Sequence, residues 1–209
     1  FGSVSPEPRR GCMPRPPLPV LMSLLLSATL LTLILPPAHS AQSDDGVDIN
    51  IDVDGDEVHL DISALIEAKP RDVWAVMTDF DHMADFISNL KSSQVIERSS
   101  PTNLTIEQHG RAGSGFLSFS LDSIRDIQMK PFEWIKSTLL SGSMRKFDGI
   151  TRLSEEGGKT RIQYHSDAIS GVWIPPVLGR SLIENEAREQ FAEIIREVMR
   201  RKQLAASRH

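Results

Sequence analysis

Pro70-Arg-Asp-Val-Trp-Ala-Val-Met-Thr-Asp-Phe-Asp-His-Met-Ala-Asp-Phe86 is the stretch of sequence that decides the fold. Proline suits the first turn of a helix, and Val73, Trp74 and Met77 then repeat at helical spacing to form one apolar face. Acidic residues in the second half of the stretch can cap another short helix that has its own apolar positions. These caps and apolar positions are Asp79, Asp81, Met83, Phe86 and Ile87. The stretch therefore predicts two short amphipathic helices in succession.

The segment upstream of this stretch predicts a β-hairpin. Apolar residues alternate with acidic or amide residues from Val47 to Val53, and Asp54-Gly55 is a hairpin turn signal. The alternation resumes at Val58 and continues to about Ala68. The acidic residues of this hairpin also loosely match a calcium-binding loop, but that loop needs helices on both sides. A solvated edge strand with one acidic face is therefore the preferred interpretation.

Downstream of the two short helices, the pattern predicts a run of strands and then one long helix. Apolar and polar residues alternate up to Ile169, with Gly, Pro and Ser residues between the runs. Pro175-Pro176 ends the sheet, and apolar residues then recur at helical spacing from Val177 to Gln203. The predicted strands are 92–98, 103–112, 115–129, 133–141, 144–155 and 159–169. This order predicts an α+β fold in which helices pack on one face of an antiparallel sheet.

A series of short motifs, taken in order, carries a resemblance to a known family. They are Pro70-x-x-Val73-Trp74-x-Val76, Asp79-Phe80-x-x-Met83-x-x-Phe86, Asn89-Leu90-Lys91, Val95-Ile96-Glu97-Arg98, Glu107-Gln108-x-Gly110, Phe147-Asp148-Gly149-x-Thr151-x-Leu153 and Thr160-Arg161-Ile162-x-Tyr164. From about Glu57 to Lys202 the chain resembles the START-like (SRPBCC) superfamily, also called the polyketide cyclase / coenzyme Q-binding group.

The resemblance implies a helix-grip (Bet v 1-like) fold, in which the antiparallel sheet wraps around the long C-terminal helix. The hairpin would then be an N-terminal extension. The resemblance also implies a cavity for a lipid, an isoprenoid quinone, a sterol or a polyketide. Some members of the superfamily are cyclases or hydrolases, and many only bind and carry their ligand.

The first 40 residues predict a leader for export. Leu18 to Leu35 is an uncharged, leucine-rich run with Arg15 just before it, and Ala38 and Ser40 are the small residues of a signal peptidase site. Cleavage would give a periplasmic or secreted bacterial protein, and the alternative is a membrane anchor formed by residues 18–35. The predicted domain limits are 1–40 for upstream residues and signal peptide, 41–56 for an acidic linker and the first strand, 57–203 for the START-like domain, and 204–209 for a tail.

Composition and charge restrict the classes of function. Of the 209 residues 40% are apolar and 24% are charged, and the formal net charge is −5. Phosphate binding needs a basic face, so nucleic acid is not expected as a partner. Cys12, the only cysteine, lies in the leader, so a hydrophobic core must hold the mature domain without disulfides. The sequence has no nucleophile elbow, P-loop, dinucleotide fingerprint or Cys/His metal motif. We therefore expect no cofactor, no metal site and no catalytic residue.

Three charged clusters have alternative interpretations. The clusters are Asp81, His82 and Asp85; Glu107 and His109; and His165 and Asp167. The first has a spacing that suits a metal, although capping and a solvated helix face are more common. The other two share strand faces and are candidate acid–base pairs. Because both faces lie opposite the apolar residues, cross-strand ladders on the surface are the preferred interpretation.

The inward faces of the predicted sheet carry the candidate ligand-binding residues. Four polar side chains stand among apolar neighbours there, and aromatic side chains supply walls. The predicted ligand-binding residues are Trp74, Phe86, Gln108, Phe119, Phe147, Thr151, Tyr164, Ser166, Trp173 and Phe191. The polar members either orient the headgroup of a ligand or satisfy one another, as buried polar groups must. The segment Ser170–Gly179 is either a portal that contacts a membrane transiently or a tight corner between sheet and helix.

Three functional hypotheses follow from the sequence. The leading one is an exported, non-enzymatic protein that binds a hydrophobic small molecule and carries it, because burial of apolar surface supplies affinity. The second is a cyclase or hydrolase in which Tyr164 and Gln108 polarise a carbonyl group. The third is an envelope interaction module that uses the acidic hairpin and an open sheet edge.

Overall fold

The structure is a computed structural model that describes residues 46–113, 118–171 and 176–208, with side chains from residue 179 onward in the last range. The predicted leader and Trp173 lie outside the described residues. The elements are β1 (Val47–Asp54), β2 (Glu57–Ile66), α1 (Pro70–Met77), the 3-10 helix η1 (Phe80–Asp85), β3 (Leu90–Ser100), β4 (Asn103–Ala112), β5 (Phe119–Lys130), β6 (Trp134–Gly142), β7 (Lys146–Glu156), β8 (Lys159–Ile169) and α2 (Pro176–Ala206).

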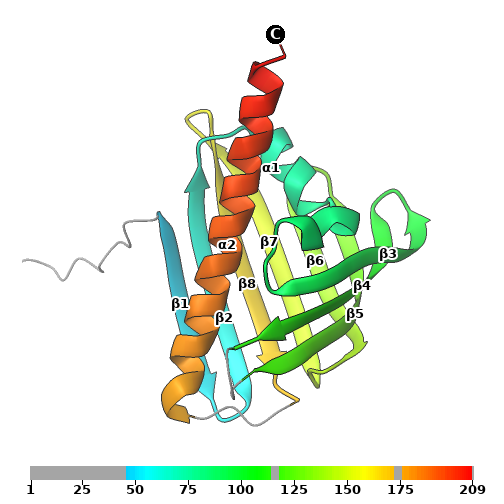
Figure 1. Ribbon diagram of the computed structural model, residues 1–209, viewed down its shortest axis with the longest axis vertical. Coiled ribbons are helices and arrows are strands. Elements are labelled where there is room, and N and C mark those ends of the chain that lie inside the picture. The colour runs from blue at the N-terminus through cyan, green and yellow to red at the C-terminus, as the bar shows by residue number, and fades with distance from the viewer. Residues whose placement is uncertain (1–45, 114–117, 172–175, 209) are drawn as a thin grey trace, which may run out of the picture. The chain divides into compact units, whose positions relative to one another are not determined.

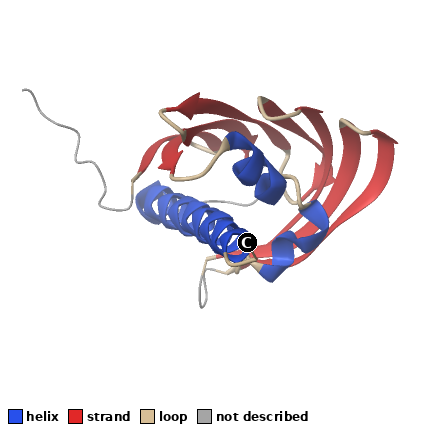
Figure 2. Cartoon of the chain, turned by 90° about the horizontal axis from the view of Figure 1, so that it is seen from above, coloured by secondary structure: helices blue, strands red, loops and turns tan. Residues whose placement is uncertain are grey.

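The described strands form one curved antiparallel sheet that grips the long C-terminal helix. Within the described residues the sheet has eight strands in the order β1-β2-β8-β7-β6-β5-β4-β3. Helix α2 lies across the concave face, and α1 and η1 cover part of the same side (Figures 1 and 2). The predicted α+β helix-grip fold is therefore confirmed. Strands β4 and β8 begin and end at the predicted residues, and α2 extends the predicted helix by a few residues.

The N-terminal hairpin is part of the hydrophobic core. Strand β1 pairs with β2 in antiparallel register from Val47 opposite Ala64 to Asp54 opposite Glu57, and Gly55 takes a φ of +63° in the turn. Val47 and Ile51 are buried, while the acidic side chains of β1 are exposed. The calcium-loop alternative fails because strands, and not helices, flank the acidic residues.

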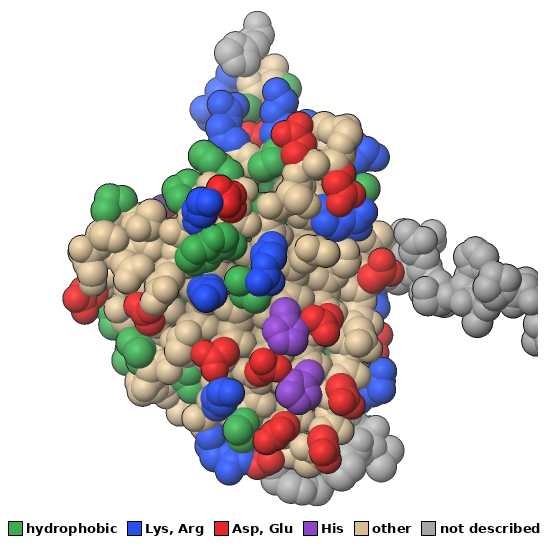
Figure 3. Space-filling model, turned by 180° about the vertical axis from the view of Figure 1, so that it is seen from behind, with side chains coloured by type: hydrophobic (Ala, Val, Ile, Leu, Met, Phe, Trp, Pro, Cys, Tyr) green, Lys and Arg blue, Asp and Glu red, His purple; other side chains and the backbone are tan. Residues whose placement is uncertain are grey.

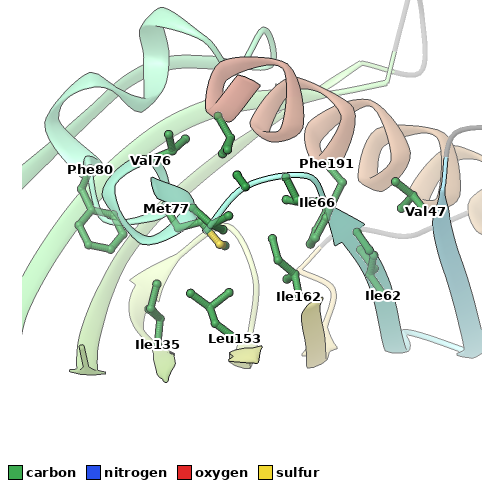
Figure 4. Packing of buried hydrophobic residues seen from close by; sticks show 14 of the residues in the cluster. Val47, Ile62, Ile66, Val76, Met77, Phe80, Ile135, Leu153, Ile162 and Phe191 are labelled. Carbon is green, nitrogen blue, oxygen red and sulfur yellow. The ribbon is translucent and has the colours of Figure 1, made fainter. Parts of the chain in front are cut away.

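The core lies between the concave face of the sheet and the helices. Figure 4 shows Phe191 pointing from α2 toward the sheet, and Val76, Met77 and Phe80 arriving from α1 and η1. Ile162 of β8 and Val198 of α2 are fully buried. Full burial of one such side chain contributes about 1.5–3 kcal/mol. The core thus fixes the position of α2 over the sheet.

The two acidic residues predicted to cap η1 have other roles, which corrects that prediction. Asp79 stands at the N-cap position of η1, but its side chain makes no capping hydrogen bond, and Asp81 lies in the first turn. Asp79 accepts from Arg201, at 2.8 Å, and its other oxygen lies 2.7 Å from Nδ1 of His82. Asp81 accepts from the backbone N–H of Val95, at 2.7 Å. The Asp79 carboxylate is thus used in ion pairs, and the Asp81 carboxylate binds a backbone N–H on the edge strand β3. Strand β3 also has several register shifts in its pairing with β4, and a covered, irregular edge is protected from pairing with another chain.

Candidate functional site

An apolar cavity of about 300 Å³ lies between α2 and the concave face of the sheet. This volume is at the lower end of the range for small-molecule sites. The walls come from β2, α1, η1 and β3 to β8 on one side and from the inward turns of α2 on the other. The apolar walls include Leu60, Ile62, Met77, Phe80, Met83, Ile106, Ile127, Ile135 and Ile194.

The structure brings five of the predicted ligand-binding residues together around this cavity. Gln108, Phe147, Thr151, Tyr164 and Phe191 all line it, although they come from β4, β7, β8 and α2. Their side chains meet because alternate residues of each strand point to the concave face. Direct contact with a ligand remains a prediction for these five residues.

Four other predicted residues lie outside the lining, and Trp173 is not described. Trp74 packs edge-on against Phe132, with ring centres 5.7 Å apart. The ring of Phe86 lies 5.7 Å from the guanidinium of Arg201. Phe119 is half-buried at the start of β5, and Ser166 is buried beside Tyr164. The angle at which the short helices pack on the sheet decides which of their side chains reach the cavity. Sequence spacing does not fix this angle.

Arg125 of β5 is the most informative residue of the cavity, and the sequence analysis missed it. Its Nη2 donates to the amide oxygen of Gln108, and its Nη1 donates to Ser137 Oγ at 3.3 Å. Within the described part of the chain, its Nε is buried and has no hydrogen-bond partner. Burial lowers the pKa of Arg125, and nearby Tyr164 acts in the opposite direction. An arginine still carries its charge at neutral pH, so a cation stands in an apolar cavity.

A short relay of hydrogen bonds holds the guanidinium of Arg125 in place. Gln108 Nε2 donates to Ser93 Oγ at 2.9 Å, and Ser93 Oγ donates to the backbone carbonyl of Phe80 at 2.5 Å. Both ends of the Gln108 amide are therefore engaged inside the protein. This result favours mutual satisfaction for Gln108 over direct recognition of a headgroup.

Tyr164 supplies a neutral hydroxyl to the same cavity. Burial raises the pKa of Tyr164, whereas the hydrogen bond with Ser166 and the charge of Arg125 act to lower it. Its ring centre lies 5.9 Å from that of Phe191, which fixes the ring against α2. An uncharged phenol at this place can donate to a ligand or accept from one.

A sequence signal for Arg125 exists in the alternation of β5. Leu121, Ser123, Arg125 and Ile127 share one strand parity, and all four line the cavity. An arginine at one of the alternate positions that face the core, among apolar neighbours at the other such positions, indicates a cation in the interior. The signal is weak because Ile124 occupies the opposite parity, so the inward face of β5 is ambiguous in sequence.

The charged clusters on β4 and β8 form ladders on the convex face of the sheet. His165 Nδ1 lies 2.7 Å from Asp61, and its Nε2 lies 3.4 Å from Asp167. Asp167 also lies 2.6 Å from His59 Nδ1. Histidine side chains stand among acidic ones on this exposed face (Figure 3). The surface-ladder interpretation is therefore confirmed for β8.

The cluster on β4 has the same arrangement. His109 Nδ1 lies 3.0 Å from Asp122 of β5, and its Nε2 lies 3.6 Å from Glu107. In residues 46–113, 118–171 and 176–208, no three His, Cys, Asp or Glu side chains converge in a way that could hold a metal ion. Among the helices of those ranges, none is long and apolar enough to cross a membrane.

Comparison with known proteins places the fold among START-like domains. The aromatase/cyclase Zhui of Streptomyces sp. R1128 is 14% identical, with a TM-score of 0.60 over 69% of this chain and 95% of that chain. A STAR-related lipid transfer protein of Xanthomonas axonopodis is 11% identical, with a TM-score of 0.63 over 76% and 97%. Human StAR-related lipid transfer protein 5 is 11% identical, with a TM-score of 0.58 over 78% and 89%.

These identities establish a common fold and nothing finer. No protein of curated function matches the chain. The model of the family described as polyketide cyclase / dehydrase and lipid transport matches residues 66–195, which is more than half of the chain. The chain therefore belongs to the polyketide cyclase / dehydrase and lipid transport family and is a START-like domain.

Proposed function

We propose that this protein binds a small hydrophobic molecule with one anionic end, and that Arg125 holds that end inside the cavity. The observation that carries the proposal is the guanidinium of Arg125, which lines the cavity and whose buried Nε has no partner among the described residues. Its two other nitrogens donate to the neutral groups of Gln108 and Ser137. A buried charge without an opposite charge is unfavourable, and a ligand carboxylate would supply both the charge and the acceptor.

The apolar walls would hold the rest of the ligand. Burial of apolar surface contributes about 25 cal/mol per Å², so a short alkyl chain or a compact ring system would bind with useful affinity. A cavity of about 300 Å³ favours such a ligand over a phospholipid with two full acyl chains. Among the ligand classes that the family resemblance implies, the proposal therefore favours compact molecules with a single apolar part.

A carrier role outside the cytoplasm is part of the proposal. The leader at residues 1–40 has the pattern of a signal peptide, and a cavity that shields an apolar molecule from water suits transfer through the periplasm. Two of the similar structures are named as lipid transfer proteins. Transient contact with a membrane would be the step at which such a carrier loads its ligand.

An enzymatic alternative rests on the pairing of Arg125 with Tyr164. One similar structure is named as an aromatase/cyclase, and a cation beside a neutral phenol could polarise a carbonyl group of a bound polyketide. Gln108 is engaged with Arg125 and Ser93, so Arg125 replaces it in this alternative. Turnover of a polyketide substrate that is lost in Tyr164→Phe, with binding retained, would favour the enzyme.

The direct test compares decanoate with decanol as ligands of the full chain by titration calorimetry. The two probes have the same apolar chain and differ in the charge of the end group. The proposal predicts tighter binding of decanoate, by roughly tenfold or more, because a hydrogen bond to a charged group is worth more than a neutral one. Equal affinity for the two probes would show that Arg125 does not recognise the charged end of a ligand. If neither probe binds, the proposal that the cavity binds hydrophobic molecules is contradicted.

A further inference from the structure

The wall between α2 and the strands β3 and β4 separates the cavity from a hollow on the outer surface. Asn89 and Arg111 line both the cavity and the hollow. Glu186 of α2 lines only the outer hollow. The two spaces therefore adjoin at these residues, where Asn89 contacts α2. A molecule that passed this point would move directly between solvent and cavity.

This part of the wall is held by a polar clasp, which we define as Asn89, Glu186, Gln190 and the backbone N–H of Gly113. The Glu186 carboxylate accepts from Asn89 Nδ2 at 3.0 Å and from Gly113 N at 2.9 Å. Gln190 Nε2 donates to Asn89 Oδ1 at 3.1 Å. Water can replace each of these partners, so the clasp can open at a small net loss of hydrogen bonding.

The remainder of α2 is attached more firmly. The helix packs against β1 and α1, with Phe191 and Val198 buried in the core. Its C-terminal half is pinned by Arg201, which pairs with both Glu197 and Asp79. Opening those contacts would expose apolar surface or break half-buried ion pairs. Opening the clasp would expose mainly polar groups.

We infer that the ligand enters and leaves through the clasp, between α2 and the strands β3 and β4. This inference rests on the proposed function and adds the route by which the cavity exchanges its contents. Separation of the clasp would open a passage while α2 stays anchored along β1 and at its C-terminal half. Glu186 is the gating residue, because it holds both Asn89 and the end of β4 and does not line the cavity itself.

The test measures exchange kinetics with 1-anilinonaphthalene-8-sulfonate, a fluorescent amphiphile that carries one negative charge, on the full chain. Stopped-flow mixing gives its association and dissociation rates, and displacement by decanoate shows that it occupies the cavity. Glu186→Ala is expected to raise both rates by the same factor, roughly three- to tenfold, and to leave the dissociation constant unchanged. Glu186→Gln, which keeps the side-chain length, is the second variant if the alanine variant does not fold.

Arg188→Ala is the matched control, because Arg188 donates from the same helix to the Val47 carbonyl, at 3.1 Å, on the β1 side. Its exchange rates should equal those of the unchanged chain. Unaltered rates in the Glu186 variants, or equal acceleration in Arg188→Ala, would overturn the route. If the probe fails to bind the unchanged chain at all, the proposed function itself is contradicted and the inference falls with it.

Discussion

The guanidinium carbon of Arg125 lies 5.6 Å from the centre of the Phe147 ring, so a cation faces an aromatic wall inside the cavity. Such a contact stabilises the cation by about 0.5–2 kcal/mol. It does not replace an opposite charge, and the hydrogen-bond partners of this guanidinium within the described residues are neutral. The protein thus keeps a charge in its interior that a ligand can still use.

Arg125→Met should separate recognition of charge from burial of the chain. Methionine has a similar length and no charge, so decanoate should bind roughly tenfold or more weakly while decanol affinity stays the same. The free energy of unfolding should change little, because removal of a buried charge, which is often neutral or stabilising, offsets the loss of the hydrogen bond to Gln108. Calorimetric titration and urea unfolding measure these two quantities.

Arg152→Met is the control for this substitution. Arg152 lies on β7 with an exposed side chain, outside the cavity lining, so its loss should change neither affinity. An equal loss of affinity for decanoate and decanol in Arg125→Met would show that Arg125 only shapes the cavity.

Two glycines that line the cavity should respond differently to alanine. A Cβ on Gly149 would lie 3.1 Å from Cζ of Phe147 and 3.6 Å from the Tyr164 hydroxyl, so it would push a side chain into the cavity. A Cβ on Gly110 would lie 2.8 Å from the backbone oxygen of Asn89, which cannot move freely. Gly149→Ala should lower decanoate affinity about tenfold with little change in stability, and Gly110→Ala should lower the free energy of unfolding by about 1–3 kcal/mol.

Calorimetry and urea unfolding of both variants check this contrast. The opposite pattern, with a destabilised Gly149→Ala and an unaffected Gly110→Ala, would mean that the walls of the cavity are arranged differently.

The strands were predictable from sequence because their information is local. In β4 and β8, apolar and polar residues alternate over most of the strand, and turn residues stand on both sides. Asn103–Ala112 and Lys159–Ile169 were therefore predicted with correct bounds. Helix α2 was predicted for a similar reason, since Pro175-Pro176 and helical spacing mark its start.

The candidate site was only partly predictable because it depends on non-local packing. Parity along a strand placed Gln108, Thr151 and Tyr164 on the concave face, where they line the cavity. The same reasoning could not show that Gln108 is engaged by Arg125, which lies on the neighbouring strand. Trp74 and Phe86 were predicted to line the cavity only because they are aromatic. Whether they do so depends on how the helices cross the sheet, which the sequence does not show.

The histidine ladder on the convex face should make stability depend on pH. The hydrogen bond with Asp61 raises the pKa of His165, and that with Asp167 raises the pKa of His59. A raised pKa means that the folded state binds protons more tightly than the unfolded state. The resulting stabilisation is complete below about pH 6.5 and is lost as the pH rises through the raised values.

The double variant His59→Gln, His165→Gln removes this contribution. Its deficit in free energy of unfolding, relative to the unchanged chain, should be larger at acidic pH than at alkaline pH. His82 also has a raised pKa, through Asp79, but it is present in both proteins and cancels in the difference. A deficit that is equal at pH 5.5 and pH 8.5 in urea unfolding would contradict the role of these protons.

Glu197 should give the opposite dependence at the acidic end. Hydrogen bonds from Arg200 and Arg201, working against burial, lower the pKa of Glu197 from 4.5 to about 2. Its side chain is 7% exposed, whereas that of Arg200 is 59% exposed. A lowered pKa gives stability that is present above the unfolded value and is lost as the pH falls toward the folded value.

Glu197→Gln should therefore lower the free energy of unfolding at pH 7 by about 1–2 kcal/mol, after solvent screening of the exposed arginine is taken into account. The deficit should shrink as the pH falls from 5 to 3, because the unchanged chain loses the same contribution there. Glu189→Gln, at an exposed position on α2, should show no deficit at either pH. A deficit in free energy of unfolding that stays constant across this pH range would mean that the glutamine side chain packs poorly. The ion pairs that hold α2 above the cavity would then contribute little to stability.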